Sequence, residues 1–482
     1  MRGETHKAKI VAGTTTQVPT LPQSIAYSLP HVAVWFLFAP LWQVIPGVYA
    51  KYFGFTLTSI AYAMLAARLL DAVVDPLIGR ASDIYKDRKG SRKLFVAVGG
   101  IAYAVCGYFL FVPPPGVHIA YFLGWFLAFV VAWTTFEIPH MAWASELSLD
   151  SSGKTRLFAI RVSAGYLGLL LFYAVPLLPV FHTTTITPET LRWSATIAGL
   201  LILPLLVICL KVTPDGRAPT RPRSSAQLGL GESASTVLRT VFRNVPLLGF
   251  FMLIALVELS NGMWYGMIFI YVDSYLGLGK QFAGMFLLAF LIGIVATPLW
   301  YQVSKRLGKN ATWGIAAAIL LVSYAFTAVL TPEHTTFANL LVLKGLNTVA
   351  LVCVGLMEPS MLSDVVDYSQ WRFRRNNAGL YFSVYIFFVK AIKAIGGALG
   401  LAIAGWYGFE PSVPIHTQSS IFGLKLAAAL LPCVLVLVSF AFLARVPIDA
   451  RAHATIRRRL QQLKDRETRD AQTAAGSCRE PV

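Results

Sequence analysis

Long apolar runs alternate with short polar segments along the whole chain. Each run holds about 18 to 28 mostly apolar residues, and about 20 are enough for an α-helix to cross the hydrocarbon core of a bilayer. The runs cover residues 24–49, 57–80, 94–113, 118–142, 159–181, 192–211, 246–275, 281–303, 312–331, 336–362, 379–408 and 420–444. The pattern therefore predicts an all-α membrane protein with twelve transmembrane helices.

A polar insert divides the twelve runs into two sets of six. This insert is rich in Pro, Arg and Ser, as flexible linkers are. Two six-helix halves joined by a linker are the architecture of many secondary transporters. The expected segments are an N-terminal cytoplasmic tail over 1–23, one half over 24–213, the linker over 214–245, the second half over 246–445 and a basic tail over 446–482.

Composition agrees with this pattern. Of the 482 residues, 56% are hydrophobic and 13% are charged, with a mean hydropathy of +0.63, whereas soluble domains carry roughly 25% charged residues. This excludes an ordinary soluble enzyme. The five cysteines are far apart and form neither a disulfide framework nor a CxxC metal motif.

The net charge of +18 follows from topology. Of the 41 Lys and Arg residues, 32 fall in the two tails and in those loops that alternate to the same side of the bundle. Lys and Arg concentrate in cytoplasmic loops, so both termini are expected in the cytoplasm, with the bundle in the plasma (inner) membrane. The expected partners are the lipid bilayer and a small-molecule substrate, without nucleic acid, and the chain is expected to be a monomer.

Three ionisable residues lie inside the second apolar run. Arg68, Asp71 and Asp75 are spaced by three, four and seven residues and so share one helical face. A charge at mid-membrane costs at least about 2.5 kcal/mol, so such residues are kept mainly for pathways and pairs. Two carboxylates beside one cation can bind Na⁺ through oxygen ligands or share a proton. The alternative is that Arg68 simply neutralises one aspartate in packing.

The fourth run adds a third carboxylate to this hypothesis. Glu137 follows Thr134 and Thr135 in the segment WTTFEIPH. A carboxylate beside hydroxyls fits an oxygen-rich cation site, and a loop-facing glutamate near the end of the helix is the alternative. No cofactor is expected beyond a coupling ion, Na⁺ or H⁺.

The second half offers polar and aromatic residues for a substrate cavity. Lys390 and Lys393 lie three apart within an apolar run and need a carboxylate or a substrate as partner. Lys344 with Asn347 is a weaker candidate of the same kind. The expected cavity residues are Trp35, Glu258, Asn261, Trp264, Tyr381 and Lys393.

Acidic and basic residues also cluster in the loops on the expected cytoplasmic side. Charge-assisted bonds between them can break and re-form as two halves rock, although topology alone also explains the basic residues. The expected gating residues are Asp83, Arg92, Glu146, Arg156, Asp364 and Asp367.

Four segments resemble the glycoside-pentoside-hexuronide:cation symporters, the melibiose-permease-like branch of the major facilitator superfamily. They are DAVVDPLIGRASD from Asp71, EIPHMAWASELSLD from Glu137, SDVVDYSQW from Ser363 and FFVKAIKAIGG from Phe387. The resemblance implies a twelve-helix fold of two pseudo-symmetric halves, alternating access and cation-driven symport of a sugar or glycoside. It assigns Asp71, Asp75, Thr134 and Glu137 to the cation site and places Lys390 near both sites, where with Arg68 it would balance charge.

The sequence departs from this family at two positions. Trp35 stands where sugar-transporting members hold a sugar-binding aspartate, and Val74 replaces a polar residue before the second cation-site aspartate. Sugar hydroxyls would thereby lose an acceptor. Both changes fit the similar lysophospholipid symporters of animals, so a lysolipid or other amphiphile is the alternative substrate.

Two other classes of protein are disfavoured. A membrane-embedded enzyme would need a nucleophile with its base or an HExxH metal pair, and the eight histidines have no such spacing. A receptor or scaffold of the same fold has no need to keep carboxylates inside the bilayer. The sequence thus predicts a transporter and not an enzyme.

Overall fold

The structure is a computed structural model that describes residues 19–147, 151–216, 245–373 and 378–443, together with 458, 459 and 462. Within these ranges the chain is helical, and twelve of its helices are long and apolar enough to cross a membrane. The predicted fold class is thereby confirmed. Most of the expected N-terminal tail, linker and C-terminal tail lies outside the described residues.

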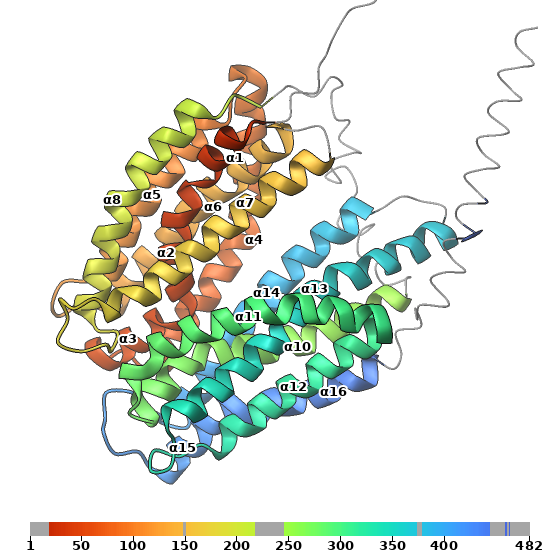
Figure 1. The fold of residues 1–482 in the computed structure, drawn as a ribbon. Helices are drawn as coiled ribbons and strands as arrows, with labels where there is room; N and C mark the ends of the chain where they lie inside the picture. Colours follow the sequence, from red (N-terminus) through yellow and green to blue (C-terminus); the bar gives the residue numbers. More distant parts are fainter. Residues whose placement is uncertain are drawn as a thin grey trace, which may run out of the picture.

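The N-terminal half contains the first six spans (Figure 1). Its helices are α1 (Leu21–Ser28), α2 (Pro30–Gln43), α3 (Ile45–Phe53), α4 (Leu57–Lys89), α5 (Lys93–Phe111), α6 (Ile119–Leu147), α7 (Ser151–Ala174), the short η1 (Val175–Leu177) and α8 (Pro188–Val212).

The C-terminal half contains the other six spans. Its helices are α10 (Val245–Ile270), the π-helical turn η2 (Tyr271–Tyr275), α11 (Gly279–Leu307), α12 (Lys309–Val329), α13 (Phe337–Phe373), α14 (Ala378–Trp406), α15 (Gln418–Lys425), the π-helical turn η3 (Leu426–Leu430) and α16 (Leu431–Leu443).

Two differences from the predicted helices have local causes. The run expected over 24–49 is split into three helices, because Pro30 and Pro46 lack the N–H that would continue the preceding helix, and each stands in the first turn of a new one. Helices α4 and α13 continue well beyond the ends of their apolar runs, since helical hydrogen bonds also form in polar sequence. Helix α4 ends only at Gly90, whose φ of +76° is left-handed.

The two halves lie side by side and diverge toward one end of the bundle (Figure 1). We call this the terminal end, because α1 begins and α16 ends there. At the opposite end the halves meet closely. A Cβ atom on Gly405 of α14 would lie 2.4 Å from the Thr58 hydroxyl of α4, and one on Gly47 of α3 would lie 2.4 Å from the Phe269 ring of α10. Small residues thus let helices of different halves approach one another.

Polar and aromatic contacts hold the opposite end closed. Thr184 Oγ1 donates to the carbonyl of Lys280 at 2.6 Å, and the rings of Tyr173 and Phe286 stack at 4.6 Å between centroids. Lys51 and Asp273 form an ion pair across the same interface. These three contacts between the halves lie at the end opposite to the terminal end.

Candidate functional site

The charged stripe predicted on the second span lies along α4. The Arg68 guanidinium donates to Asp71 Oδ2 at 2.6 Å and stacks 3.8 Å from the centre of the Trp42 ring. The Asp71 side chain is 8% exposed, so this pair is held within the N-terminal half. Arg68 therefore balances the first of the two aspartates.

Asp75 joins three helices of both halves. Its Oδ1 accepts a hydrogen bond from Thr134 Oγ1 of α6 at 2.8 Å, and its Oδ2 lies 3.1 Å from Lys390 Nζ of α14. The Lys390 ammonium also lies 4.4 Å from the centre of the Trp133 ring. The Asp75 and Lys390 side chains keep 23% and 31% of their surface exposed, respectively. This second aspartate thus sits where the halves meet, within reach of solvent.

Close packing of α14 brings Lys390 to this position. A Cβ on Gly396 would lie 2.3 Å from the carbonyl of Leu259, so α14 presses directly on α10. Gly397, on the same segment, faces Met64 of α4. These two glycines therefore let one helix contact both a neighbour in its own half and the aspartate helix of the other half.

Glu137 has different partners from those expected. Its Oε1 accepts a hydrogen bond from Arg161 of α7, and its Oε2 lies 3.3 Å from His31 Nε2 of α2. The structure shows no hydrogen bond between Glu137 and the Asp75 group among the described residues. The three carboxylates expected in one cluster thus fall into separate ion-pair groups.

Sequence reasoning does not single out Arg161 and His31 as functional residues. Arg161 lies only two residues inside the run predicted over 159–181, at the border of a loop, whereas α7 begins at Ser151 and so places Arg161 ten residues inside a helix. His31 follows a proline at the start of α2 and is one of eight scattered histidines. A predicted span that began nearer Ser151 would have marked Arg161 as an intramembrane cation. Such a buried guanidinium needs an acidic partner.

The cavity candidates of the second half form a looser group. Lys393 Nζ lies 3.9 Å from Glu258 Oε2, and Asn261 donates to the same oxygen at 3.4 Å. The Lys393 side chain is 46% exposed, and its ammonium lies 5.2 Å from the centre of the Tyr265 ring. Lys393 thus faces open space from the C-terminal half.

The aromatic candidates differ in their accessibility. Trp264 and Tyr381, expected to line the cavity, are 0% and 1% exposed, because both are packed inside the C-terminal half. Trp35 is half-buried against Gly165 and Phe38. Trp133, which the sequence did not single out, stacks on Phe38 at 4.6 Å and carries Lys390 on its ring. Of these three rings of the N-terminal half, Trp35 and Phe38 are half-buried and Trp133 is 9% exposed.

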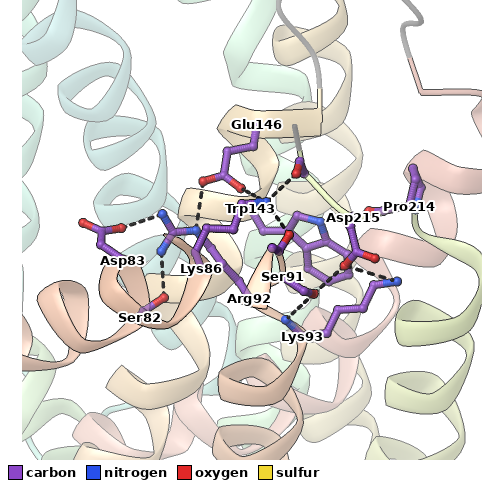
Figure 2. A network of polar contacts seen from close by, with 12 residues as sticks. Ser82, Asp83, Lys86, Ser91, Arg92, Lys93, Trp143, Glu146, Pro214 and Asp215 are labelled. Atoms are coloured by element: carbon purple, nitrogen blue, oxygen red, sulfur yellow. Dashed lines mark hydrogen bonds and ion pairs between the residues drawn. The ribbon is translucent and has the colours of Figure 1, made fainter. Parts of the chain in front are cut away.

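Three of the expected gating residues meet at the terminal end (Figure 2). Arg92 at the start of α5 donates to Ser82 at 2.7 Å, to Asp83 at 2.5 Å and to Glu146 at 2.9 Å. Lys86 lies 3.3 Å from Glu146 and donates to the carbonyl of Gly216. These contacts lie within the N-terminal half, apart from Gly216 at the start of the expected linker.

The remaining gating candidates lie elsewhere at this end. Arg156 of α7 donates to the carbonyl of Pro19. Asp364 of α13 binds Lys309 of α12 at 2.7 Å, inside the C-terminal half, and Asp367 follows one turn later. The structure thus separates these residues into one group per half.

Twelve spans in two six-helix halves, with ionisable groups at the seam, define a multi-pass membrane transporter. The chain matches the family described as "MFS/sugar transport protein" over residues 26–450. It belongs to this family of cation symporters of the major facilitator superfamily, and it is a transporter rather than an enzyme. The family predicted from the sequence is confirmed.

Relatives and solved structures agree with this assignment. The chain is 24% identical to the glucuronide carrier protein homolog of Escherichia coli (88% of this chain, 92% of the relative). It is 22% identical to the sodium-dependent lysophosphatidylcholine symporter 1-A of Danio rerio (83% and 80%) and to the inner membrane symporter YicJ of E. coli (94% and 97%). The nucleoside transporter NupG has a similar fold, with a TM-score of 0.58 at 15% identity over 88% of this chain and 98% of that one.

Proposed function

We propose that this protein is a symporter that couples the movement of Na⁺ or H⁺ to that of a small solute by alternating access. The observation that carries the proposal is the contact between Lys390 and Asp75, which joins the two halves at mid-bundle through a single carboxylate. A cation that binds Asp75 would compete directly with the Lys390 ammonium. Ion binding and the position of one half against the other are thereby linked.

The cation would bind on the N-terminal half. Asp71 and Asp75 lie one turn apart on α4, and Thr134 already bonds Asp75; carboxylate and hydroxyl oxygens are the ligands that hard cations prefer. Arg68 and Lys390 would balance the carboxylates when no cation is bound. A bound ion releases Lys390, and it favours whichever arrangement of the halves binds it more tightly.

Glu137 would serve the substrate side of the site, alongside its proposed share in cation binding. Its partner Arg161 lies four residues before Gly165, on which Trp35 packs, and His31 lies one turn before Trp35 on α2. A charged pair thus stands beside a half-buried indole. Lys393, Glu258 and Asn261 would face the substrate from the other half.

We propose a sugar or glycoside as the substrate. Aromatic rings beside paired charges suit a pyranose, because the ring stacks on the apolar face and the charges bond the hydroxyls. The proposal is supported by the family description and by the relative named a glucuronide carrier homolog. A lysolipid is the second candidate, favoured by the contiguous wall of Trp35, Phe38 and Trp133 and by the lysophosphatidylcholine symporter among the relatives.

The terminal end would face the cytoplasm. The basic loops gather there, including the cluster around Arg92 and Lys86, and positive residues are retained on the cytoplasmic side. With the opposite end closed by Lys51 and Asp273, the structure would then represent an inward-facing conformation. Both termini would lie on the cytoplasmic side of a plasma (inner) membrane.

Ligand-induced thermal stabilisation of the purified protein tests this proposal. Unfolding would be followed with glycosides, uronates and lysolipids, each with and without Na⁺ and at two pH values. We expect one class of compound to raise Tm, by an amount that grows with Na⁺ or with acidity. An unchanged Tm for every compound and ion would contradict the proposed symport.

A further inference from the structure

Two glutamates lie buried in the C-terminal half, away from the Asp75 group. Glu258 of α10 is 6% exposed and Glu358 of α13 is 2% exposed. Both lie well inside transmembrane spans, and the charge of Glu258 acts on Glu358. Glu358 has no part in the symport proposed above, so its presence in the bilayer needs a separate explanation.

The oxygens of this pair are only partly satisfied. Tyr385 of α14 donates to Glu358 Oε2 at 2.8 Å, while Glu358 Oε1 is buried without a hydrogen-bond partner. Beside Glu258, the amide oxygen of Asn261 is likewise buried without a partner. Both orphaned atoms are acceptors. The cluster therefore has too few donors, and one added proton would supply a donor.

The charges facing the pair do not balance it. The titratable groups around the two glutamates are Tyr265 of α10, Tyr385 and Lys393 of α14, and Tyr324 of α12, which lies near Glu258. The single cation among these groups is Lys393, whose ammonium is 3.9 Å from Glu258. One lysine thus opposes two carboxylates, and in a medium of low dielectric constant the unbalanced negative charge is disfavoured.

The other lysines near this half do not correct the imbalance. Lys309 of α12 is bound to Asp364. Lys344 lies on the ring of Tyr265 and bonds Asn347. It is fourteen residues before Glu358 on α13, which is about 21 Å along a helix. Neither ammonium can therefore act as the counter-charge of Glu358.

We propose that Glu358 holds a proton and, with Glu258, forms a proton-binding site in the C-terminal half, separate from the cation site at Asp75. Lys393 forms the border between this site and the open space, because it is half exposed and also contacts Glu258. Loss of the proton draws the Lys393 ammonium toward the pair. The use of this site as a second coupling site, filled in addition to the cation site, rests on the proposed symport.

Infrared difference spectroscopy of the purified full-length protein tests the site without any substrate. In neutral buffer exposed carboxyl groups are ionised, so a carboxylic-acid carbonyl band that shifts in D₂O and disappears in alkaline buffer reports buried acids. We expect Glu358→Gln to abolish this band. Glu333→Gln is the matched control, because Glu333 is 85% exposed and its loss should leave the band intact. A full band in Glu358→Gln overturns the proposal.

Two further variants separate this site from the proposed function. Glu258→Gln removes a negative charge but leaves Glu358 buried with its Oε1 unpartnered, so the band should persist in neutral buffer. Loss of the band there would place the proton on Glu258 and overturn its assignment to Glu358. Asp75→Asn should keep the band even though it removes cation-dependent stabilisation, so the failure of one proposal leaves the other testable.

Chemical modification of the unaltered protein covers the case in which Glu358→Gln does not fold. Dicyclohexylcarbodiimide reacts with protonated carboxylic acids in apolar surroundings, and mass spectrometry of the peptides locates the adduct. We expect labelling at Glu258 or Glu358 in neutral buffer and its loss in alkaline buffer. Labelling at neither glutamate under both conditions overturns the proposal.

Discussion

Lys51 of α3 and Asp273 of η2 form an ion pair across the two halves, with 2.7 Å between Nζ and Oδ2. The aspartate side chain is 2% exposed, whereas the lysine is 28% exposed. The pair thus closes the opposite end with one partner buried, and the buried partner makes the closure sensitive to the loss of the other.

Lys51→Gln should open the opposite end. It leaves the Asp273 carboxylate buried without its counter-charge, which costs about 1–3 kcal/mol or more for a charged group. Electron paramagnetic resonance distances between spin labels at Val180 and Ile415, both exposed near this end, should shift to a longer population.

Lys305→Gln is the control for this prediction. Lys305 lies on α11 at the terminal end and should not change the distances. Asp273→Asn in the Lys51→Gln background should restore the closed population in part, because it removes the unpaired charge. Distances unchanged in Lys51→Gln would show that the aromatic and glycine contacts close this end by themselves.

Asp75→Asn should abolish ion-dependent stabilisation. The amide keeps the shape of the side chain but no longer carries the charge that attracts both a cation and Lys390. We expect the Na⁺- or acid-dependent part of the Tm shift to disappear. Asp87→Asn, at an exposed position on the same helix, should keep it in full. Retention of the shift in Asp75→Asn would place the cation site elsewhere.

Gly262→Ala should destabilise the C-terminal half. A Cβ there would lie 1.9 Å from the carbonyl of Lys393, so α10 and α14 would have to move apart. Overpacking of this kind costs about 1–3 kcal/mol, which thermal unfolding in detergent would report as a lower Tm. Gly249→Ala on the same helix meets open space and should leave Tm unchanged or slightly raised.

Arg92→Ala should lower stability more than Arg88→Ala. Arg92 connects Ser82, Asp83 and Glu146. Lys86 stays beside Glu146 and Asp83 is 42% exposed, so we expect the cost of losing hydrogen bonds to charged groups, about 1.5–3 kcal/mol. Arg88 is exposed on α4 and serves as the control. Arg92→Lys should not restore stability, because an ammonium lacks the planar fork of donors. Equal stability of the two alanine variants would contradict the role of this network.

The sequence predicted those relationships that follow from one helix. Arg68, Asp71 and Asp75 share a face because helical spacing places them there, and Arg68 does bond Asp71. The pairing of Lys390 with Asp75 joins residues 315 positions apart and depends on how α14 packs against α4. The spacing along one helix carries no information on that packing.

Glu137 shows the limit of such local inference. Thr134 and Glu137 are three residues apart and are expected to bind the same cation. In the structure, Thr134 bonds Asp75 while Glu137 bonds Arg161. The apolar pattern starts the fifth span at 159, whereas α7 starts at Ser151, so the pattern assigns Arg161 to the border of a loop. A helix end misplaced by eight residues thus removes the true partner from consideration.

The segment that follows α8 is fastened to the N-terminal half. Trp143 donates to the carbonyl of Pro214 at 3.0 Å, Ser91 bonds Asp215, and Lys86 bonds the carbonyl of Gly216. A force transmitted along the chain from the C-terminal half would therefore act on these three contacts before it acted on α8. It follows that a cut in the chain after Gly216 should leave α8 held in the N-terminal half, because every partner in these three contacts lies before the cut.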